Sequence, residues 1–251
     1  MWRDGVLWFG FAMALMYEGG IFLLHLILGK AWFNMKTLRR ELRMIALEPW
    51  GVVSLFAASL GIILAEQGNR MLEFFGSEDY ILHALTTALV RDFVPLLVGI
   101  FVSARGGVGL AVRLADMSLR REVDALILMD ISLLRFLVAP TLIADLVAIL
   151  LLVVWCDLVG ILASGLYLVV QRDLPFLMFL GIVLDGLEFG HLLLSMVKSM
   201  TMGVLIVTIA ALTGFNVTQH DGGSATVATR TMVRAFLAIV LIQLVFTLLV
   251  E

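Results

Sequence analysis

The feature that most constrains this chain is the length of its uninterrupted apolar segments. Residues Ile131–Val170 are almost entirely apolar and show no alternation of apolar and polar positions. The strands of a transmembrane β-barrel alternate, so these continuous runs indicate helices. A helix of this segment's length would measure about 60 Å, twice the hydrocarbon thickness of a bilayer. We therefore expect it to protrude from the membrane, bend or break, with Gly160 and Ser164–Gly165 as its soft points.

The composition points to the same environment and excludes several functions. Hydrophobic residues make up 62% of the chain and charged residues 15%, against about half and a quarter in soluble proteins. The net charge of −3 comes with no dense basic patch, so a nucleic-acid partner is not expected. A single cysteine, Cys156, and scattered histidines indicate no disulfide and no metal site. We find no nucleotide-binding or hydrolytic motif, so this chain is predicted to be no enzyme and to bind no cofactor.

The apolar segments predict an all-α membrane protein with five transmembrane helices. The spans are Ile131–Val170 and four others: Pro49–Leu64, Tyr80–Ala104, Phe189–Phe215 and Ala225–Val250. We expect one membrane domain over residues 1–251, in which residues 1–48 form interfacial helices and 49–251 the bundle. Val6–Leu28 either spans or lies in the interface. Lys36–Glu48 is a basic amphipathic helix predicted to lie on the cytoplasmic membrane surface.

Basic residues are distributed unequally between the segments that join the spans. By the positive-inside rule, the segments rich in lysine and arginine face the cytoplasm. This places Lys30–Arg43, Gly106–Arg135 and Asn216–Arg234 on the cytoplasmic side, with only Arg70 and Arg172 opposite. The chain is therefore predicted to end on the outer side.

The cytoplasmic segment Gly106–Asp130 is charged and amphipathic. Its glycines, Gly106, Gly107 and Gly109, predict a tight exit from the preceding span. The rest forms a helix that either is gripped by a separate ATPase or lies on the inner leaflet. The residues alone do not separate these two interpretations.

Ionisable residues inside the spans are candidates for function. A charge in hydrocarbon costs at least about 2.5–3.5 kcal/mol, so such residues usually pair or line a cavity. Arg91 and Asp92 are neighbours, so on a helix they point about 100° apart. We predict that Asp92 faces Lys198 across the bundle. This pair either fixes helix packing or contacts lipid headgroups and couples conformational change.

Two further aspartates lie in the third span. Asp157 is close to its outer end and is expected to be solvated there. Asp145 lies deeper, and the sequence indicates no partner for it.

A resemblance to a known family runs in order through most of the chain. The segment Leu89–Pro95, LVRDFVP, resembles the L-x-R-E-x-x-P stretch of the MlaE/YrbE permease family. The family's later elements, G-R-x-G, E-Q-I-D-A-L, K-S and A-T-T, resemble residues 104–107, 121–126, 198–199 and 228–230. The match covers roughly residues 39–251. No single motif is decisive, but their combination in this order is specific to the family.

The resemblance implies a permease subunit of an MCE-associated ABC transporter that moves phospholipids between the inner and outer membranes. It implies a homodimer in the bacterial inner membrane that carries cytoplasmic ABC ATPase subunits and periplasmic MCE-domain subunits. A small STAS-domain protein is a further implied partner. ATP and Mg²⁺ would then be bound by the ATPase, and the complex would maintain outer-membrane lipid asymmetry. The family's fold has five spans, an N-terminal interfacial helix and a cytoplasmic coupling helix.

The resemblance assigns residues to two roles. Arg91, Asp92 and Lys198 match the family's intramembrane charges, whereas Gln243 stands where an acid is common. The ATPase-coupling helix would carry seven residues: Arg113, Asp116, Met117, Arg120, Arg121, Glu122 and Asp124. Arg113 and Arg121 replace acids of the family, which predicts an acidic groove on the ATPase partner. The alternative function is an ATPase-independent carrier or scaffold, a class that commonly has inverted repeats, and we find no such repeat here.

Overall fold

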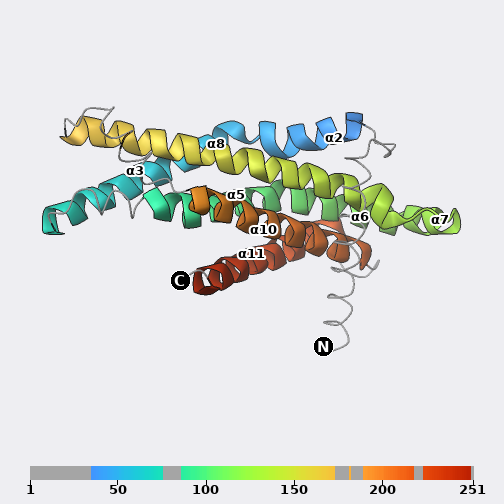
Figure 1. Cartoon of the computed structure of the whole chain (residues 1–251). Helices are drawn as coiled ribbons and strands as arrows, with labels where there is room; N and C mark the ends of the chain where they lie inside the picture. Colours follow the sequence, from blue (N-terminus) through green and yellow to red (C-terminus); the bar gives the residue numbers. More distant parts are fainter. Residues whose placement is uncertain (1–34, 76–85, 173–180, 182–188, 218–222, 250–251) are drawn as a thin grey trace.

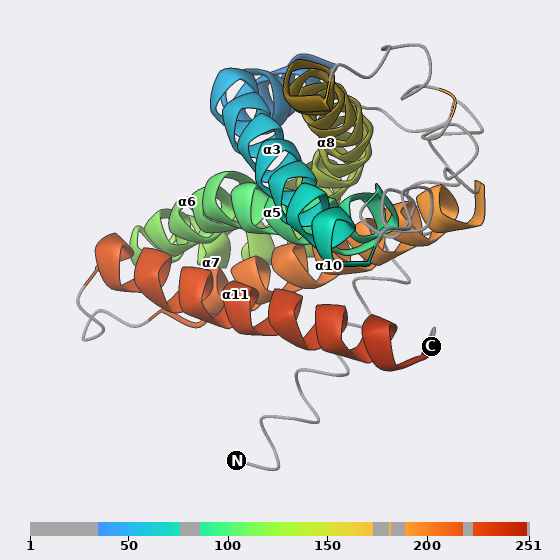
Figure 2. The same cartoon turned by 90° about the vertical axis from the view of Figure 1, so that its left-hand side faces the viewer.

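The computed structural model describes residues 35–75, 86–172, 181, 189–217 and 223–249. Within these residues, five helices are long and apolar enough to cross a membrane: Arg39–Met71, Thr86–Leu119, Phe136–Gln171, Gly190–Phe215 and Ser224–Leu249. They pack into one bundle (Figures 1 and 2). The predicted all-α membrane fold is confirmed. The division at residue 48 stays a prediction, and Val6–Leu28 lies outside the described residues.

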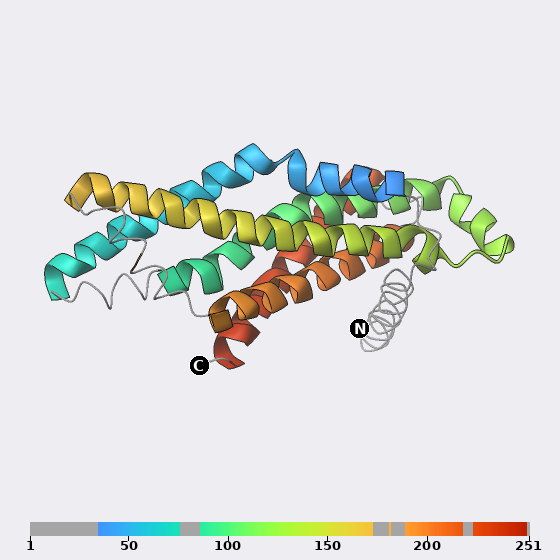
Figure 3. The same cartoon turned by 45° about the horizontal axis from the view of Figure 1, so that its top comes forward.

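The first long helix begins in the segment predicted to lie on the membrane surface. Helix α2 (Met35–Leu42) continues through the π-helical η1 (Arg43–Leu47) into α3 (Trp50–Phe75). Helix α2 packs along α8 (Figure 3), and Glu41 and Ile45 on this stretch are buried. It is therefore part of the bundle, because its apolar face covers another helix. The predicted span ends at Leu64, whereas α3 continues to Phe75.

The second long helix passes straight through the glycines that predict an exit. It comprises η2 (Leu89–Phe93), α5 (Val94–Val102), η3 (Ser103–Gly107) and α6 (Val108–Leu119). A Cβ atom at Gly106 would overlap the Asp145 carboxyl group, and one at Gly107 would lie 2.7 Å from Cγ2 of Ile206. The predicted tight exit is wrong. These glycines are needed because neighbouring side chains approach the helix closely.

The predicted coupling segment, residues 106–130, is divided between two helices. Its first half is α6, which packs against α10 and α11 inside the bundle. The break follows at Arg120 and Arg121, where Arg121 has a left-handed φ of 59°. A short helix, α7 (Glu122–Leu128), then projects at one end of the molecule (Figure 1), and Leu128 is 87% exposed.

The third long helix does not bend or break at the predicted soft points. After η4 (Leu134–Val138), helix α8 (Ala139–Arg172) is α-helical throughout its 34 residues. Its length of about 51 Å exceeds the hydrocarbon thickness. Of the three outcomes expected for this segment, breaking is excluded within Ala139–Arg172 and protrusion remains. Tilting, which was not among them, also accommodates a long helix.

Gly160 instead marks a close crossing between α8 and α3. A Cβ atom at Gly61 of α3 would overlap the carbonyl oxygen of Gly160. Further along, the rings of Trp50 and Trp155 meet edge to face at 4.6 Å, and the Trp155 indole donates a hydrogen bond to Ser54 Oγ at 2.8 Å. The small residues allow backbone contact, which is how helices commonly associate in membranes.

The last two helices match the predicted spans closely. Helix α10 (Phe189–Phe215) contacts α5, α6, α8 and α11 (Ser224–Leu249) and so lies at the centre of the bundle. One end of the bundle holds the start of α2, the end of α6, α7 and the start of α11. That end carries most of the basic residues, while Arg70 lies near the far end of α3. The structure thus gathers in space the described parts of the basic segments that the positive-inside rule assigns to the cytoplasm.

Candidate functional site

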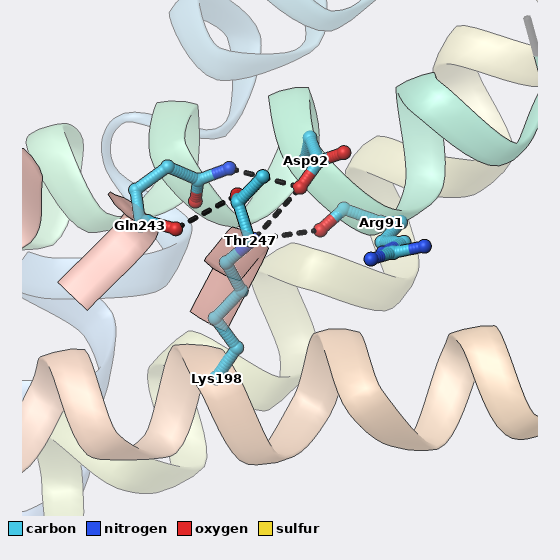
Figure 4. Close-up of polar contacts among 5 residues, drawn as sticks. All are labelled: Arg91, Asp92, Lys198, Gln243 and Thr247. Carbon is cyan, nitrogen blue, oxygen red and sulfur yellow. Dashed lines mark hydrogen bonds and ion pairs between the residues drawn. The ribbon is translucent and has the colours of Figure 1, made fainter. Parts of the chain in front are cut away.

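The centre of the candidate site is a lysine inside the α10 span. The Lys198 side chain is 1% exposed, in a helix apolar enough to cross a membrane. Its Nζ lies 2.9 Å from Oδ1 of Asp92 on the second long helix (Figure 4). The contact predicted between these two residues is confirmed. Whether the pair acts in transport stays a prediction.

The backbone beside Asp92 supplies a second acceptor for this lysine. Residues 89–93 form a π-helical turn, a feature frequently found at functional sites. Pro95 has no N–H, so the Arg91 carbonyl four residues earlier cannot receive the usual helical hydrogen bond from it. Lys198 Nζ donates to that carbonyl oxygen at 3.2 Å. The local sequence thus leaves free an acceptor that the buried ammonium group uses.

A third helix contributes Gln243, which the predicted site did not include. The amide Nε2 of Gln243 on α11 donates to Asp92 Oδ1 at 3.0 Å (Figure 4). The signal in the sequence is a lone amide in an otherwise apolar run, at a position where the resembling family often has an acid. Lys198 and Gln243 therefore converge on one carboxylate oxygen from two different helices.

The cluster is only partly enclosed. The Asp92 side chain is 35% exposed, whereas its partner Lys198 is almost completely buried. Arg91 is half-buried, and its guanidinium group points away from the pair (Figure 4). Two neighbouring residues of a long apolar helix thus carry a carboxylate and a guanidinium, and each side chain is partly exposed. Such groups can contact a polar or charged molecule of either sign.

The predicted coupling residues do not form one surface. Arg113 lies within α6 and forms an ion pair with the buried Glu41 of α2. Asp116 and Met117 are half-buried in the same helix. Four residues are exposed at the junction of α6 and α7: Arg120, Arg121, Glu122 and Asp124. The charge at Arg113 therefore already has a partner within the chain, although its side chain is 37% exposed, whereas the four junction residues are exposed and have no such buried partner among the described residues.

Asp157 lies elsewhere than predicted. It is 5% exposed, and neither carboxyl oxygen has a hydrogen-bond partner among the described residues. The expectation of solvation is wrong because α8 extends to Arg172, well beyond this residue. The described part of the chain holds no group of three His, Cys, Asp or Glu residues that could bind a metal ion.

Replacing Gln243 with leucine is expected to have a modest effect. The change removes one hydrogen bond to a charged acceptor, while Lys198 still pairs with Asp92. We expect a loss of about 1 kcal/mol in stability, measured by thermal unfolding in detergent. Thr247→Val is the matched control, because the Thr247 hydroxyl donates only to the Gln243 carbonyl within α11. A loss as large as that caused by removing Asp92 would contradict this assignment.

Comparison with known proteins gives one consistent family. The model of the permease MlaE family matches residues 38–249. A probable ABC transporter permease of Rickettsia typhi is 24% identical over 83% of this chain and 80% of its own. The intermembrane phospholipid transport system permease protein MlaE of Haemophilus influenzae is 20% identical over 92% of this chain and 89% of its own. A probable ABC transporter permease of Synechocystis is 24% identical over 93% and 88%. This multi-pass membrane protein therefore belongs to the MlaE permease family.

Proposed function

We propose that this chain is the permease subunit of an ABC transporter that moves phospholipids between the inner and outer membranes. The observation that carries the proposal is the half-open charged cluster of Asp92, Arg91 and Lys198. Charges inside spans usually mark a substrate path or a water-filled cavity. A phospholipid headgroup carries an anionic phosphate, which suits Arg91, and in some lipids an amine, which suits Asp92. The family, and the name of the Haemophilus relative as an intermembrane phospholipid transport permease, support the same substrate class.

Exposed apolar helix faces support a homodimer with an apolar cavity. Helix α11 presents large exposed side chains along its length, as does α3. Two copies that meet near these helices would enclose an apolar space for acyl chains between their charged clusters. The location proposed is the bacterial inner membrane, with the basic end of the bundle in the cytoplasm.

A separate ATPase is the proposed energy source. The exposed junction of α6 and α7 lies at the basic end, where a cytoplasmic subunit could bind. ATP and Mg²⁺ belong to that subunit. Periplasmic MCE-domain subunits would cover the other end, and a small STAS-domain protein would join the cytoplasmic side.

Co-purification separates this proposal from its rival, an ATPase-independent carrier or scaffold. The full chain is extracted from its native membrane in mild detergent or in polymer discs, and its partners are identified by mass spectrometry. The permease brings an ATPase and an MCE-domain protein with it. A chain that comes out alone under both conditions would favour the carrier.

Charge reversal at the α6–α7 junction tests the docking site. Arg120→Glu combined with Arg121→Glu is expected to weaken ATPase binding about tenfold or more, through repulsion from an acidic groove. Both side chains are exposed, so folding is retained. Arg70→Glu, an exposed reversal near the opposite end, is the matched control. Pull-down titration measures the affinity. Unchanged binding in the double variant would exclude the junction as the docking site.

A further inference from the structure

Three arginines near the start of the first long helix have no role in the proposed function. Arg39 and Arg40 lie on α2 and Arg43 opens η1, and all three side chains are exposed. None of them forms an ion pair within the described part of the chain, whereas Arg105 and Arg113 are both paired. We call these three residues the basic stripe. Its positive charge is available to an anion outside the molecule.

The opposite face of the same helix is fixed to the bundle. Glu41 pairs with Arg113 of α6, and Oε2 of Glu48 lies 3.2 Å from Nη1 of Arg105. Ile45, between the two acids, is buried. Arg39 and Arg43 each lie two residues from Glu41, which places them about 160° away around the helix. The contacts that hold the helix therefore turn the basic stripe away from the bundle.

The basic stripe continues without a break into an apolar surface. Leu47 and Trp50 follow Arg43 at intervals of four and three residues, so they lie on the same face of the helix. Their side chains are 58% and 42% exposed, and the next turns expose Leu55. Arg43 lies about 10 Å before Trp50 along the helix, within the depth of a headgroup layer. Tryptophan is enriched at that boundary in membrane proteins.

We propose that the basic stripe binds anionic phospholipid headgroups of the leaflet at the basic end of the bundle. Guanidinium groups bind phosphate through paired hydrogen bonds, and basic clusters beside a span commonly bind anionic lipids. The apolar surface at Leu47 and Trp50 fits the acyl chains of the same lipids. A free phosphate or a soluble acidic protein would leave that surface unused. These lipids are resident, because the site lies on the outside of the first long helix and not at the charged cluster of Asp92.

A competition between two lipids tests the site. The purified full chain in detergent receives equal amounts of phosphatidylglycerol and phosphatidylcholine with identical acyl chains. Both lipids contain a phosphate, but only phosphatidylglycerol has a net charge. Native mass spectrometry measures the ratio of the two bound lipids, and the wild type should retain mostly phosphatidylglycerol. Replacing all three arginines of the basic stripe with glutamine should lower this ratio about tenfold, whereas replacing them with lysine should largely preserve it.

Arg120→Gln combined with Arg121→Gln is the matched control. These arginines are exposed at the same end of the bundle but lie at the junction of α6 and α7, so the ratio should not change. Thermal unfolding without added lipid should be the same for all variants, because every replaced side chain is exposed.

Three results would overturn the proposal. The first is a wild type without preference, or a glutamine variant that keeps it. The second is an equal loss in the control, which would assign the preference to the basic end as a whole. The third is a glutamine variant that keeps its lipids but no longer co-purifies with the ATPase, which would assign the basic stripe to a protein partner. The lipid measurement involves no transport, so its failure would leave the proposed function standing.

Discussion

Asp92→Ala is expected to destabilise the protein more than any other single change at the charged cluster. The substitution strands the Lys198 ammonium group, which is 1% exposed and, among the described residues, would keep only the Arg91 carbonyl and no counter-ion. Removing one partner of a buried ion pair typically costs about 3–5 kcal/mol. Thermal unfolding in detergent measures the loss, and lipid transport should be abolished with it.

Removing the lysine of this pair, rather than the aspartate, should cost less stability. Lys198→Met leaves Asp92 without its cation, but this carboxylate is 35% exposed and keeps the Gln243 amide. The remaining amide bond offsets part of the effect, and a loss of about 1–2 kcal/mol is expected. The double variant Asp92→Asn with Lys198→Met removes both charges and should recover most of the stability. Equal losses in the two single variants, or no recovery in the double variant, would show that the pair is not asymmetric in this way.

The second large effect is expected at the crossing of α3 and α8. Gly61→Ala places a methyl group onto the Gly160 carbonyl oxygen, and a backbone atom cannot turn aside as a side chain can. The helices must separate, which also pulls Trp155 away from Ser54 and Trp50. Overpacking of this kind costs about 3 kcal/mol. We expect a large fall in unfolding temperature and in the yield of folded protein.

Gly51→Ala gives the contrast within the same helix. A Cβ atom there meets no heavy atom within 4 Å, so the change should be neutral or slightly stabilising through helix propensity. Opposite signs at Gly61 and Gly51 identify the backbone contact as the cause. Similar behaviour of the two alanine variants would mean that α3 and α8 do not cross closely in the membrane.

The sequence predicts the number of spans because hydropathy is a property of each segment alone. The bounds of α10 and α11 follow from their apolar runs almost to the residue. The ends of α3 and the second long helix do not, because tertiary contacts extend both helices through polar or glycine residues. At Gly106 and Gly160 the sequence shows that a side chain is absent. Which neighbour occupies that space depends on the packing of helices distant in the chain.

The same distinction applies to the candidate site. The pairing of Asp92 with Lys198 follows from the cost of charge in hydrocarbon, which leaves few possible partners within the spans. Gln243 carries no charge, so the same argument does not reach it. Arg113 looks like a docking residue in the sequence because its partner, Glu41, is 72 positions away. Only the folded structure, which brings Glu41 of α2 to Arg113 of α6, shows that this charge already has a partner within the chain.

Transport by the assembled complex tests the central claim most directly. The permease and the ATPase and MCE-domain proteins that co-purify with it are reconstituted in liposomes that contain a labelled phospholipid. Transfer of the label to acceptor liposomes is followed with ATP and with a non-hydrolysable analogue. We predict ATP-dependent transfer by the wild type and its loss in the stable double variant, Asp92→Asn with Lys198→Met. Undiminished transfer by that variant, or ATP hydrolysis that moves no phospholipid, would contradict the account.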